Sequence, residues 1–487
     1  MFLAQLCIVF HFVLYLCTME KIIGRQEEFE KLSKFMTSDK GEFVAVYGRR
    51  RVGKTFLIRQ YFKDKFDFYV TGIIDGSRDE EMAVFNEALT EYGHKGAKAK
   101  TWMEAFGFLA NLLQSKKKRG KRLVVFIDEL PCFDTPNARF VHALSHFWNS
   151  KGAWMDNLFF VVCGSATSWM IKNVIDNHGG LHNRITHEMH LRPFDLHETE
   201  EYLKSNGMRW NRLSIIQIYM VLGGIPYYLG MLDKAMSVAE NIDSLFFSDD
   251  AELRKEYPRL FKSLFKDPEN YVTLINVLAD CKQGMTRKEI VELPQFKSNG
   301  HLTVMLDNLV SCDFVRLYNN GTKQNGGIYQ LTDFYTLFYN KFCKRRTTDD
   351  HYWRNHLDTN TMNNWYGLAY ERVCMYHFRN IIRALRLDSI HTEFYSWRSK
   401  TSSPGAQIDM VIDRSDNVVT ICEVKYSKGD YLLKKSEYEK VLNRISTFDD
   451  EKKGRKAIQP VAITTYGIKQ NEYSDVFYKT LTMDDLF

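Results

Sequence analysis

Cysteine is sparse in this 487-residue chain, and the arrangements that it forms with histidine around zinc are missing. The nine cysteines are scattered and include no Cys-x-x-Cys pair. His187 and His190 are three positions apart, whereas the zinc-protease motif places its two histidines four apart. The sequence therefore offers no zinc site, and isolated thiols in apolar surroundings are typical of a reduced, cytoplasmic protein.

Strong charge of either sign is also missing. The net charge is +6, with 26% charged and 45% hydrophobic residues. This balance indicates soluble globular domains, and a chain of this length is expected to form two to four of them. The weak positive charge neither indicates nor opposes a nucleic-acid partner.

Apolar runs long enough to suggest a membrane segment are confined to residues 2–17, which are apolar apart from Gln5 and His11. This run is short for a membrane span. A signal peptide would have basic residues before its apolar run, and none is present here. A typical soluble sequence begins at Met19. We therefore expect residues 1–18 to be an upstream extension and no membrane partner; a membrane anchor is the minority alternative.

A glycine-rich segment follows the buried strand expected at residues 43–47 and precedes a helix expected at 56–62. Gly48 and Gly53 allow the sharp turn of a phosphate-binding loop, Lys54 reaches the β and γ phosphates, and the Thr55 hydroxyl binds magnesium. The sequence therefore predicts ATP and Mg²⁺ as ligands. The predicted nucleotide-binding residues of this loop are Gly48, Arg49, Arg50, Arg51, Val52, Gly53, Lys54, Thr55 and Phe56.

Two acids end a second apolar run at residues 122–127. Asp128 is predicted to orient magnesium and Glu129 to polarise the attacking water, which indicates hydrolysis and not binding alone. After a third buried strand at 158–163, Ser165 is the first candidate for a γ-phosphate sensor and Thr167 the second. Arg184 is a candidate for stabilising phosphoryl charge, although a lone arginine is more often a surface or ion-pair residue.

These motifs, together with segments 23–32, 183–185 and 223–229, resemble the archaeal-type ATPases related to the AAA+ and STAND families. The resemblance implies that Gly24 and Arg25 lie near the adenine edge and that Pro226 packs in a helical lid against the base. It also implies an α/β fold with a P-loop parallel sheet. We assign residues 19–195 to the ATPase core and 196–262 to the lid.

Residues 263–345 are predicted to form a winged helix, with helices near 273–278, 286–291 and 301–310 and a hairpin of 314–318 with 328–331. Such modules commonly bind DNA through the third helix. Here that helix has no arginine, and only Lys323 of the wing is basic. Protein docking or intramolecular packing is therefore about as well supported as DNA binding.

A C-terminal hairpin is predicted for residues 407–412 and 418–425, with one acid inside each apolar strand. A turn centred near Ser415 places Asp409 opposite Ile421 and diagonal to Glu423, with Lys425 beside it. Two carboxylates and an ammonium suit a Mg²⁺ or Mn²⁺ ion and phosphodiester chemistry. A register shift of one residue would break this arrangement.

Asp409 and Glu423-Val-Lys425 resemble the PD-(D/E)xK nuclease family, and Glu371 resembles the acid of its preceding helix. Pro404 does not immediately precede Asp409, which departs from the pattern. The resemblance implies that residues 346–487 form an α/β restriction-endonuclease-like domain and that double-stranded DNA is a partner. The alternative is a salt-bridged hairpin without catalysis.

Taken together, the motifs predict an ATPase whose nucleotide state controls a C-terminal metal-dependent nuclease-like or DNA-binding domain. The alternative is a regulatory switch that binds DNA or a protein through the winged helix and cleaves nothing. A protein partner or self-association is open under either hypothesis, because an arginine supplied in trans would require an oligomer.

Overall fold

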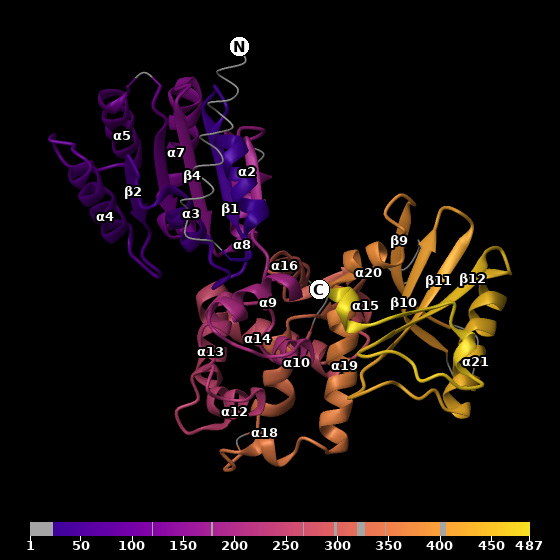
Figure 1. The fold of residues 1–487 in the computed structure, drawn as a ribbon. Coiled ribbons are helices and arrows are strands. Elements are labelled where there is room, and N and C mark those ends of the chain that lie inside the picture. The colour runs from indigo at the N-terminus through magenta and orange to yellow at the C-terminus, as the bar shows by residue number, and fades with distance from the viewer. Residues whose placement is uncertain are drawn as a thin grey trace.

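The computed structural model describes residues 23–118, 120–176, 179–265, 267–296, 300–318, 327–345, 347–399 and 406–487. Residues 1–18, Lys323 and Pro404 lie outside these ranges. Figure 1 shows an N-terminal α/β unit, a mostly helical centre and a C-terminal α/β unit. None of the helices in the described ranges has the length and apolar content needed to cross a bilayer.

The N-terminal unit is built on a parallel sheet with the strand order β2-β3-β4-β1-β5. Every pairing in this sheet is parallel, which confirms the predicted P-loop type of sheet. Its strands are β1 (Glu42–Tyr47), β2 (Phe68–Thr71), β3 (Leu123–Asp128), β4 (Leu158–Gly164) and β5 (His187–His190). Its helices are α2 (Gln26–Met36), α3 (Lys54–Phe62), α4 (Arg78–Glu91), α5 (Trp102–Lys116), α6 (Leu130–Phe133), α7 (Phe140–Ser150) and α8 (Thr167–Met170).

Alternating side chains of the strands serve two cores. Val46 and Phe126 pack with α3 on one face, whereas Ala45 and Val125 pack with α4, α5 and α7 on the other. Strands buried on both faces read as continuous apolar runs, which is why three of them were recognisable in the sequence. In a parallel sheet their carboxyl ends meet at one edge, so the phosphate loop and the acids share that edge.

A helical bundle follows the sheet over the residues that are expected to form the lid, and the lid role itself stays a prediction. It consists of α9 (Leu196–Ser205), α10 (Arg212–Leu222), α11 (Pro226–Leu229), α12 (Val238–Ile242) and α13 (Glu252–Leu264). Asp195 caps α9 through the Glu198 N–H at 2.8 Å, and Asn211 caps α10 through Ser214 at 2.9 Å. We call residues 196–265 the lid bundle.

The middle unit, residues 267–345, combines short helices with a three-stranded sheet of order β6-β8-β7. Its elements are α14 (Pro268–Asp280), β6 (Met285–Thr286), α15 (Arg287–Val291), α16 (Gly300–Ser311), β7 (Val315–Tyr318), β8 (Ile328–Leu331) and α17 (Phe334–Phe338). Three helices and the hairpin therefore occur where the sequence predicts them. The winged-helix assignment remains a prediction.

The C-terminal unit, residues 347–487, has a mixed five-stranded sheet of order β13-β12-β11-β10-β9. Its elements are α18 (Tyr352–Asn355), α19 (Asn360–Tyr376), α20 (Phe378–Ala384), β9 (Thr392–Arg398), β10 (Gln407–Arg414), β11 (Val418–Lys425), α21 (Lys435–Lys452), β12 (Ala457–Thr464) and β13 (Lys479–Leu481). The β9-β10-β11 pairings are antiparallel and the β11-β12-β13 pairings are parallel. Figure 1 shows α19 and α21 beside this sheet.

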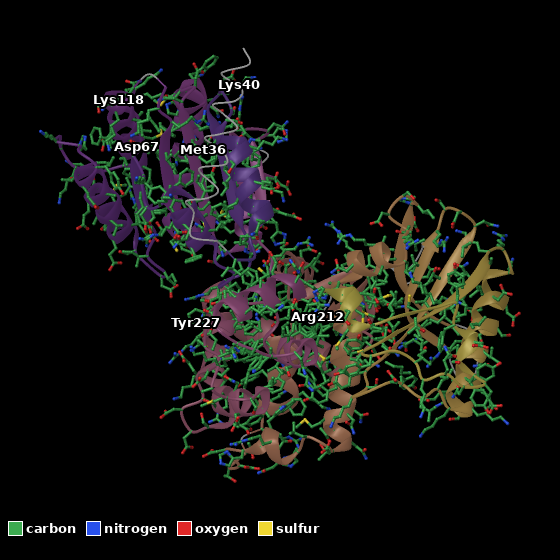
Figure 2. All side chains as sticks on the ribbon, viewed as in Figure 1. Met36, Lys40, Asp67, Lys118, Arg212 and Tyr227 are labelled. Atoms are coloured by element: carbon green, nitrogen blue, oxygen red, sulfur yellow. The ribbon has the colours of Figure 1, made fainter. Side chains whose placement is uncertain are left out.

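The lid bundle and the C-terminal unit are in direct contact. Arg212, labelled in Figure 2, pairs with Asp484 at 2.8 Å and lies 4.5 Å from the ring centre of Phe487. Gln217 donates to the Tyr426 hydroxyl at 2.9 Å. His377 accepts from the Leu196 N–H at 2.9 Å, and burial lowers the pKa of its imidazole to about 4, so the neutral acceptor form prevails at neutral pH.

Candidate nucleotide site and C-terminal acids

The phosphate loop turns between β1 and α3 with the backbone angles that its glycines permit. Gly48 has φ +143°, and a Cβ there would lie 2.2 Å from the Leu191 carbonyl oxygen. Gly53 has φ +91° and immediately precedes α3. These two positions therefore require glycine, as the motif predicts.

Lys54 lies over this loop. Its Nζ donates to the carbonyl oxygens of Gly48 at 2.8 Å and Arg49 at 2.9 Å. Arg25 supports the same loop, because its guanidinium donates to Val52 O at 3.0 Å and Arg192 O at 2.8 Å. Lys54 is thus placed to exchange backbone oxygens for phosphate oxygens.

The predicted acids stand at the same edge. Thr55 Oγ1 donates to Asp128 Oδ2 at 2.7 Å, and burial raises the pKa of Asp128. Glu129 has φ +46°, and its carboxylate accepts from the Ser165 N–H at 3.2 Å and the Ser165 hydroxyl at 2.5 Å. The structure therefore brings Thr55 to Asp128 and Ser165 to Glu129. Ser165 holds the acid itself, a role that differs from phosphate sensing.

Arg51 connects the phosphate loop to the lid bundle. Its guanidinium lies 4.0 Å from the ring centre of Tyr227 and 3.0 Å from Glu256 Oε1. Figure 2 labels Tyr227 at the left edge of the bundle. Pro226, the residue before it, begins α11 and is half-buried. The predicted lid residue is thus adjacent to a direct phosphate-loop contact.

The other predicted residues differ in their distance from these acids and from Lys54. Gly24, with φ +67°, packs against Phe194 and Glu198, so a Cβ there would lie about 3.0 Å from that ring. Arg50 is half-buried, and Phe56 is 61% exposed. Arg184 is exposed ahead of β5, and no ion pair involves it in the described part of the chain. The structure therefore does not bring Arg184 to Lys54 or Glu129.

Arg49 points away from the loop into the middle unit. Its guanidinium forms a two-point ion pair with Asp333, one contact at 3.2 Å and one shorter, and stacks 4.4 Å from the Phe314 ring centre. Arg49 is 2% exposed and Asp333 6%. Although burial lowers the Arg49 pKa, the Asp333 carboxylate outweighs it and the net pKa is raised. Sequence motifs gave no sign of Asp333 because it is 284 residues away.

A buried acid lies beside the Glu129 loop. Glu81 accepts the Ile73 N–H at 2.8 Å through one oxygen, while its other oxygen has no hydrogen-bond partner among the described residues. Burial raises the pKa of this carboxyl to about 7. Glu81 holds Ile73, and the preceding Gly72 packs against Cys132 and the Glu129 carbonyl, so Glu81 supports the segment beside Glu129.

We expect Glu81→Gln to raise the free energy of unfolding by about 1–3 kcal/mol at pH 8 but hardly at all at pH 4. Below the ordinary pKa of 4.5 the carboxyl is neutral in both states. As the pH rises toward 7 only the unfolded state ionises, so the native state loses stability that an amide would not lose. Urea unfolding at both pH values tests this, with the exposed Glu87→Gln on the same helix as control. Equal gains at both pH values would contradict the assignment.

The C-terminal hairpin differs from the prediction in register. Met410 pairs with Cys422 and Val411 with Ile421, so Ile421 does not lie opposite Asp409. Continuing this register by one residue places Asp409 opposite Glu423. The prediction was wrong by two residues because the loop has three residues and ends at Asn417, whose φ is +66°. A shift of two keeps both acids on one face.

Each C-terminal acid already has a partner. Glu423 contacts Lys425 at 2.7 Å and Arg444 at 2.5 Å, and its pKa is lowered because these cations outweigh the effect of burial. Asp409 accepts from the Gln407 amide at 2.7 Å. Glu371 pairs with Lys282 at 3.0 Å.

The pKa of Glu371 is raised by burial and by the nearby Asp409. Within the described ranges, no three His, Cys, Asp or Glu side chains are grouped to hold a metal ion. The predicted ligands Asp409, Glu423 and Glu371 therefore do not form a ready-made metal site in this arrangement.

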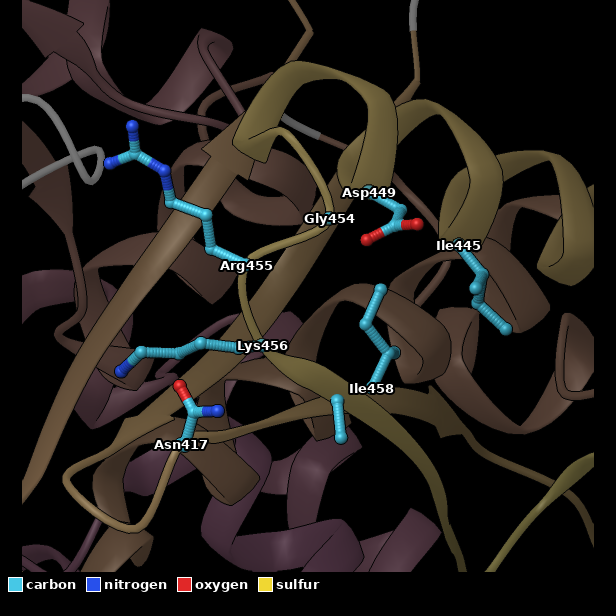
Figure 3. A pocket seen from close by; sticks show the side chains of 8 residues that line it. Asn417, Ile445, Asp449, Gly454, Arg455, Lys456 and Ile458 are labelled. Carbon is cyan, nitrogen blue, oxygen red and sulfur yellow. The ribbon is translucent and has the colours of Figure 1, made fainter.

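A surface pocket of the same unit lies at the opposite end of β11. Figure 3 shows its lining residues, which include Asn417, Asp449, Arg455 and Lys456. Asn417 precedes Glu423 by six residues, roughly 20 Å along a strand. The pocket is therefore separate from the acids.

Several residues of these sites carry no motif of their own. They are Asp333, Glu256, Lys282, Gln407 and Arg444. Four of them contact a predicted residue from another part of the chain, so only the fold reveals them. Gln407 lies two residues before Asp409, and its contact follows from the direction of its side chain.

Comparisons with known proteins agree on the N-terminal unit. Residues 22–232 match a family described as an ATPase domain predominantly from Archaea. An uncharacterized protein of Methanocaldococcus jannaschii is 25% identical over 331 residues, 66% of this chain and 68% of that protein. An uncharacterized ATP-binding protein of the same organism is 42% identical over 43 residues, 9% of this chain and 73% of that protein.

Solved structures show more distant similarity. A Walker-type ATPase of Pyrococcus abyssi is 18% identical with a TM-score of 0.45, covering 66% of this chain and 97% of that one. Cdc6p from Pyrobaculum aerophilum is 15% identical with a TM-score of 0.31, covering 66% and 93%. Because these scores are low, the assignment of the N-terminal unit rests on the family match and the motif geometry.

Proposed function

We propose that this chain hydrolyses ATP and that its nucleotide state controls the C-terminal unit, since residues 22–232 match an archaeal ATPase domain family. The Thr55–Asp128 and Ser165–Glu129 contacts at one sheet edge support this most directly. Thr55 and Asp128 fit Mg²⁺, which would neutralise phosphate charge, because their oxygens are close together beside the loop. Lys54 binds the β and γ phosphates, and Glu129 accepts the proton of the attacking water.

The position of the adenine base is proposed from contacts beside the same loop. Arg25 bridges the loop and the segment after β5, and Gly24 packs beside it, so both are positioned near the base as the resemblance implies. Pro226, at the start of α11, would bound the base on the side of the lid bundle. Arg184 is retained only as a candidate that would need a conformational change or a second subunit to reach phosphate.

Lys54→Ala tests the nucleotide site. Loss of its charge-assisted contacts is expected to weaken ATP binding roughly 10- to 100-fold, measured with a fluorescent ATP analogue. Lys63→Ala, at the end of α3, is a control outside the loop and should bind as the wild type does. Undiminished ATP binding in Lys54→Ala would remove the basis of the ATPase proposal.

For the C-terminal unit we propose a nuclease-like domain acting on double-stranded DNA, with a winged-helix middle unit. Asp409 opposite Glu423, with Lys425 at 2.7 Å from Glu423 and Glu371 nearby, supports it. The acids would have to exchange their present partners before Mg²⁺ or Mn²⁺ could bind.

Lys425→Ala tests this part of the proposal. We expect DNA cutting in Mg²⁺ or Mn²⁺ buffers to fall about 100-fold, the lower range for loss of one proton-transfer group, while ATP hydrolysis is retained. Lys428→Ala is the matched control, since Lys428 pairs with the exposed Asp358 instead. Equal cutting by the two variants would exclude a catalytic role for Lys425.

The second candidate is a non-cleaving regulatory switch that binds DNA or a protein partner. The pairing of all three acids with side-chain donors favours it. Intact DNA under every metal and nucleotide condition, with ATP hydrolysis preserved, would support this function.

A further inference from the structure

A turn of the middle unit lies against the C-terminal acids. Residues 281–284 connect α14 to β6, and the Gly284 N–H donates to the Cys281 carbonyl at 3.0 Å. Lys282 Nζ lies 3.0 Å from Glu371. The Gln283 side chain is hydrogen-bonded to Gln407, which in turn donates to Asp409 at 2.7 Å.

The turn is held by the small sheet behind it and, at the Lys282 carbonyl, by Arg372 of α19. Gln330 of β8 donates to the Lys282 carbonyl at 2.8 Å, and Tyr318 of β7 donates to the Gln283 carbonyl at 2.6 Å. Met285, just after the turn, pairs with Tyr329. A movement of β8 must therefore move the turn or break these bonds.

The same strand leads to the phosphate loop. Asp333 follows β8 by two residues and holds the buried Arg49 guanidinium. The Arg49 carbonyl accepts from Lys54 at 2.9 Å. When Lys54 turns to triphosphate oxygens, Arg49 loses this bond, so the phosphate loop and β8 respond to the same event.

We propose that turn 281–284 is an autoinhibitory cover on the C-terminal acids and that β8, through the Arg49–Asp333 pair, makes its release dependent on ATP. The inference rests on the proposed function, because it regulates the nuclease-like site. The cover acts chemically as well as sterically. The Lys282 ammonium uses a Glu371 oxygen lone pair that a metal ion or an attacking water would require. Gln283 acts indirectly, because its amide is bonded to Gln407, whose own amide occupies Asp409.

The Lys282–Glu371 contact allows a test that does not depend on DNA cutting. A water-soluble carbodiimide activates a carboxyl group, and an amine in contact displaces the resulting urea to form an amide. Cross-linked peptides are then quantified by mass spectrometry in the full chain. The Lys204–Glu200 pair, 3.0 Å apart on one lid helix, is the internal reference because domain movement cannot separate it.

We expect a non-hydrolysable ATP analogue with Mg²⁺ to lower the Lys282–Glu371 yield at least about threefold relative to this reference, as release of most molecules requires. Asp333→Asn should abolish the response, since asparagine retains the helix cap of α17 but not the charge that holds Arg49. An unchanged yield in wild-type protein that demonstrably binds the analogue would overturn the inference and leave the proposed function intact. Absence of nucleotide binding would defeat both.

DNA cutting gives the second readout. Lys282→Ala is expected to cut without ATP, whereas Lys288→Ala, an exposed lysine of the same unit, should still require it. Loss of cutting only in Lys282→Ala would make Lys282 part of the reaction centre and overturn the cover. If no variant cuts DNA, the nuclease function fails, while the cross-linking result still decides whether the turn moves.

Discussion

In Glu129→Gln, ATP turnover is expected to fall by about 10²- to 10⁴-fold while ATP binding remains. The amide has the size of the carboxylate but cannot accept a proton from water. It also cannot accept two hydrogen bonds from Ser165 through both of its terminal atoms, as Glu129 does. Phosphate release at saturating ATP measures turnover, and equilibrium binding of a fluorescent analogue measures retention.

Asp134→Asn is the matched control for that variant. Asp134 lies five residues farther along the chain and accepts from the Trp169 indole at 3.2 Å, so it shares the region but not the Ser165 contact. Its turnover should stay within about twofold of wild type. Comparable turnover in Glu129→Gln and wild type would show that another group activates the water.

Arg49→Ala is expected to destabilise the protein by about 3–5 kcal/mol, because it leaves the Asp333 charge buried without its partner. The control is Arg50→Ala, at the adjacent half-buried position, which should cost less than about 1 kcal/mol. Urea unfolding monitored by tryptophan fluorescence compares the two variants.

The double variant Arg49→Ala/Asp333→Asn separates charge from packing. Removal of the unpaired charge should recover part of the lost stability, so the two effects are non-additive. Additive losses, or equal stability of the Arg49→Ala and Arg50→Ala proteins, would show that the pair contributes no coupling.

The ATPase core could be predicted because its signals are local. Gly48, Gly53 and Lys54 act within one turn, and apolar runs mark the buried strands. The C-terminal register was harder, since it depends on whether the hairpin loop ends at Asn417 in the left-handed conformation. That asparagine is a usable signal, because three-residue hairpin loops commonly end with such a residue.

Contacts between units were beyond sequence reasoning. The turn residue Lys282 and the acid Glu371 belong to segments that no periodicity connects, and Asp333 looks like an ordinary helix cap. Their roles follow from tertiary packing. The sequence likewise placed Ser165 at the correct strand end but not its bond to Glu129.

The Arg49–Asp333 pair also has a consequence for biosynthesis. At about 5–20 residues per second, Asp333 is synthesised roughly 14–57 s after Arg49, since the two are 284 positions apart. During that interval the nascent ATPase unit must keep a guanidinium hydrated at a position that becomes buried. Synthesis of the sheet strands therefore does not by itself complete the phosphate loop, because Arg49 reaches its final position only after the middle unit has been synthesised.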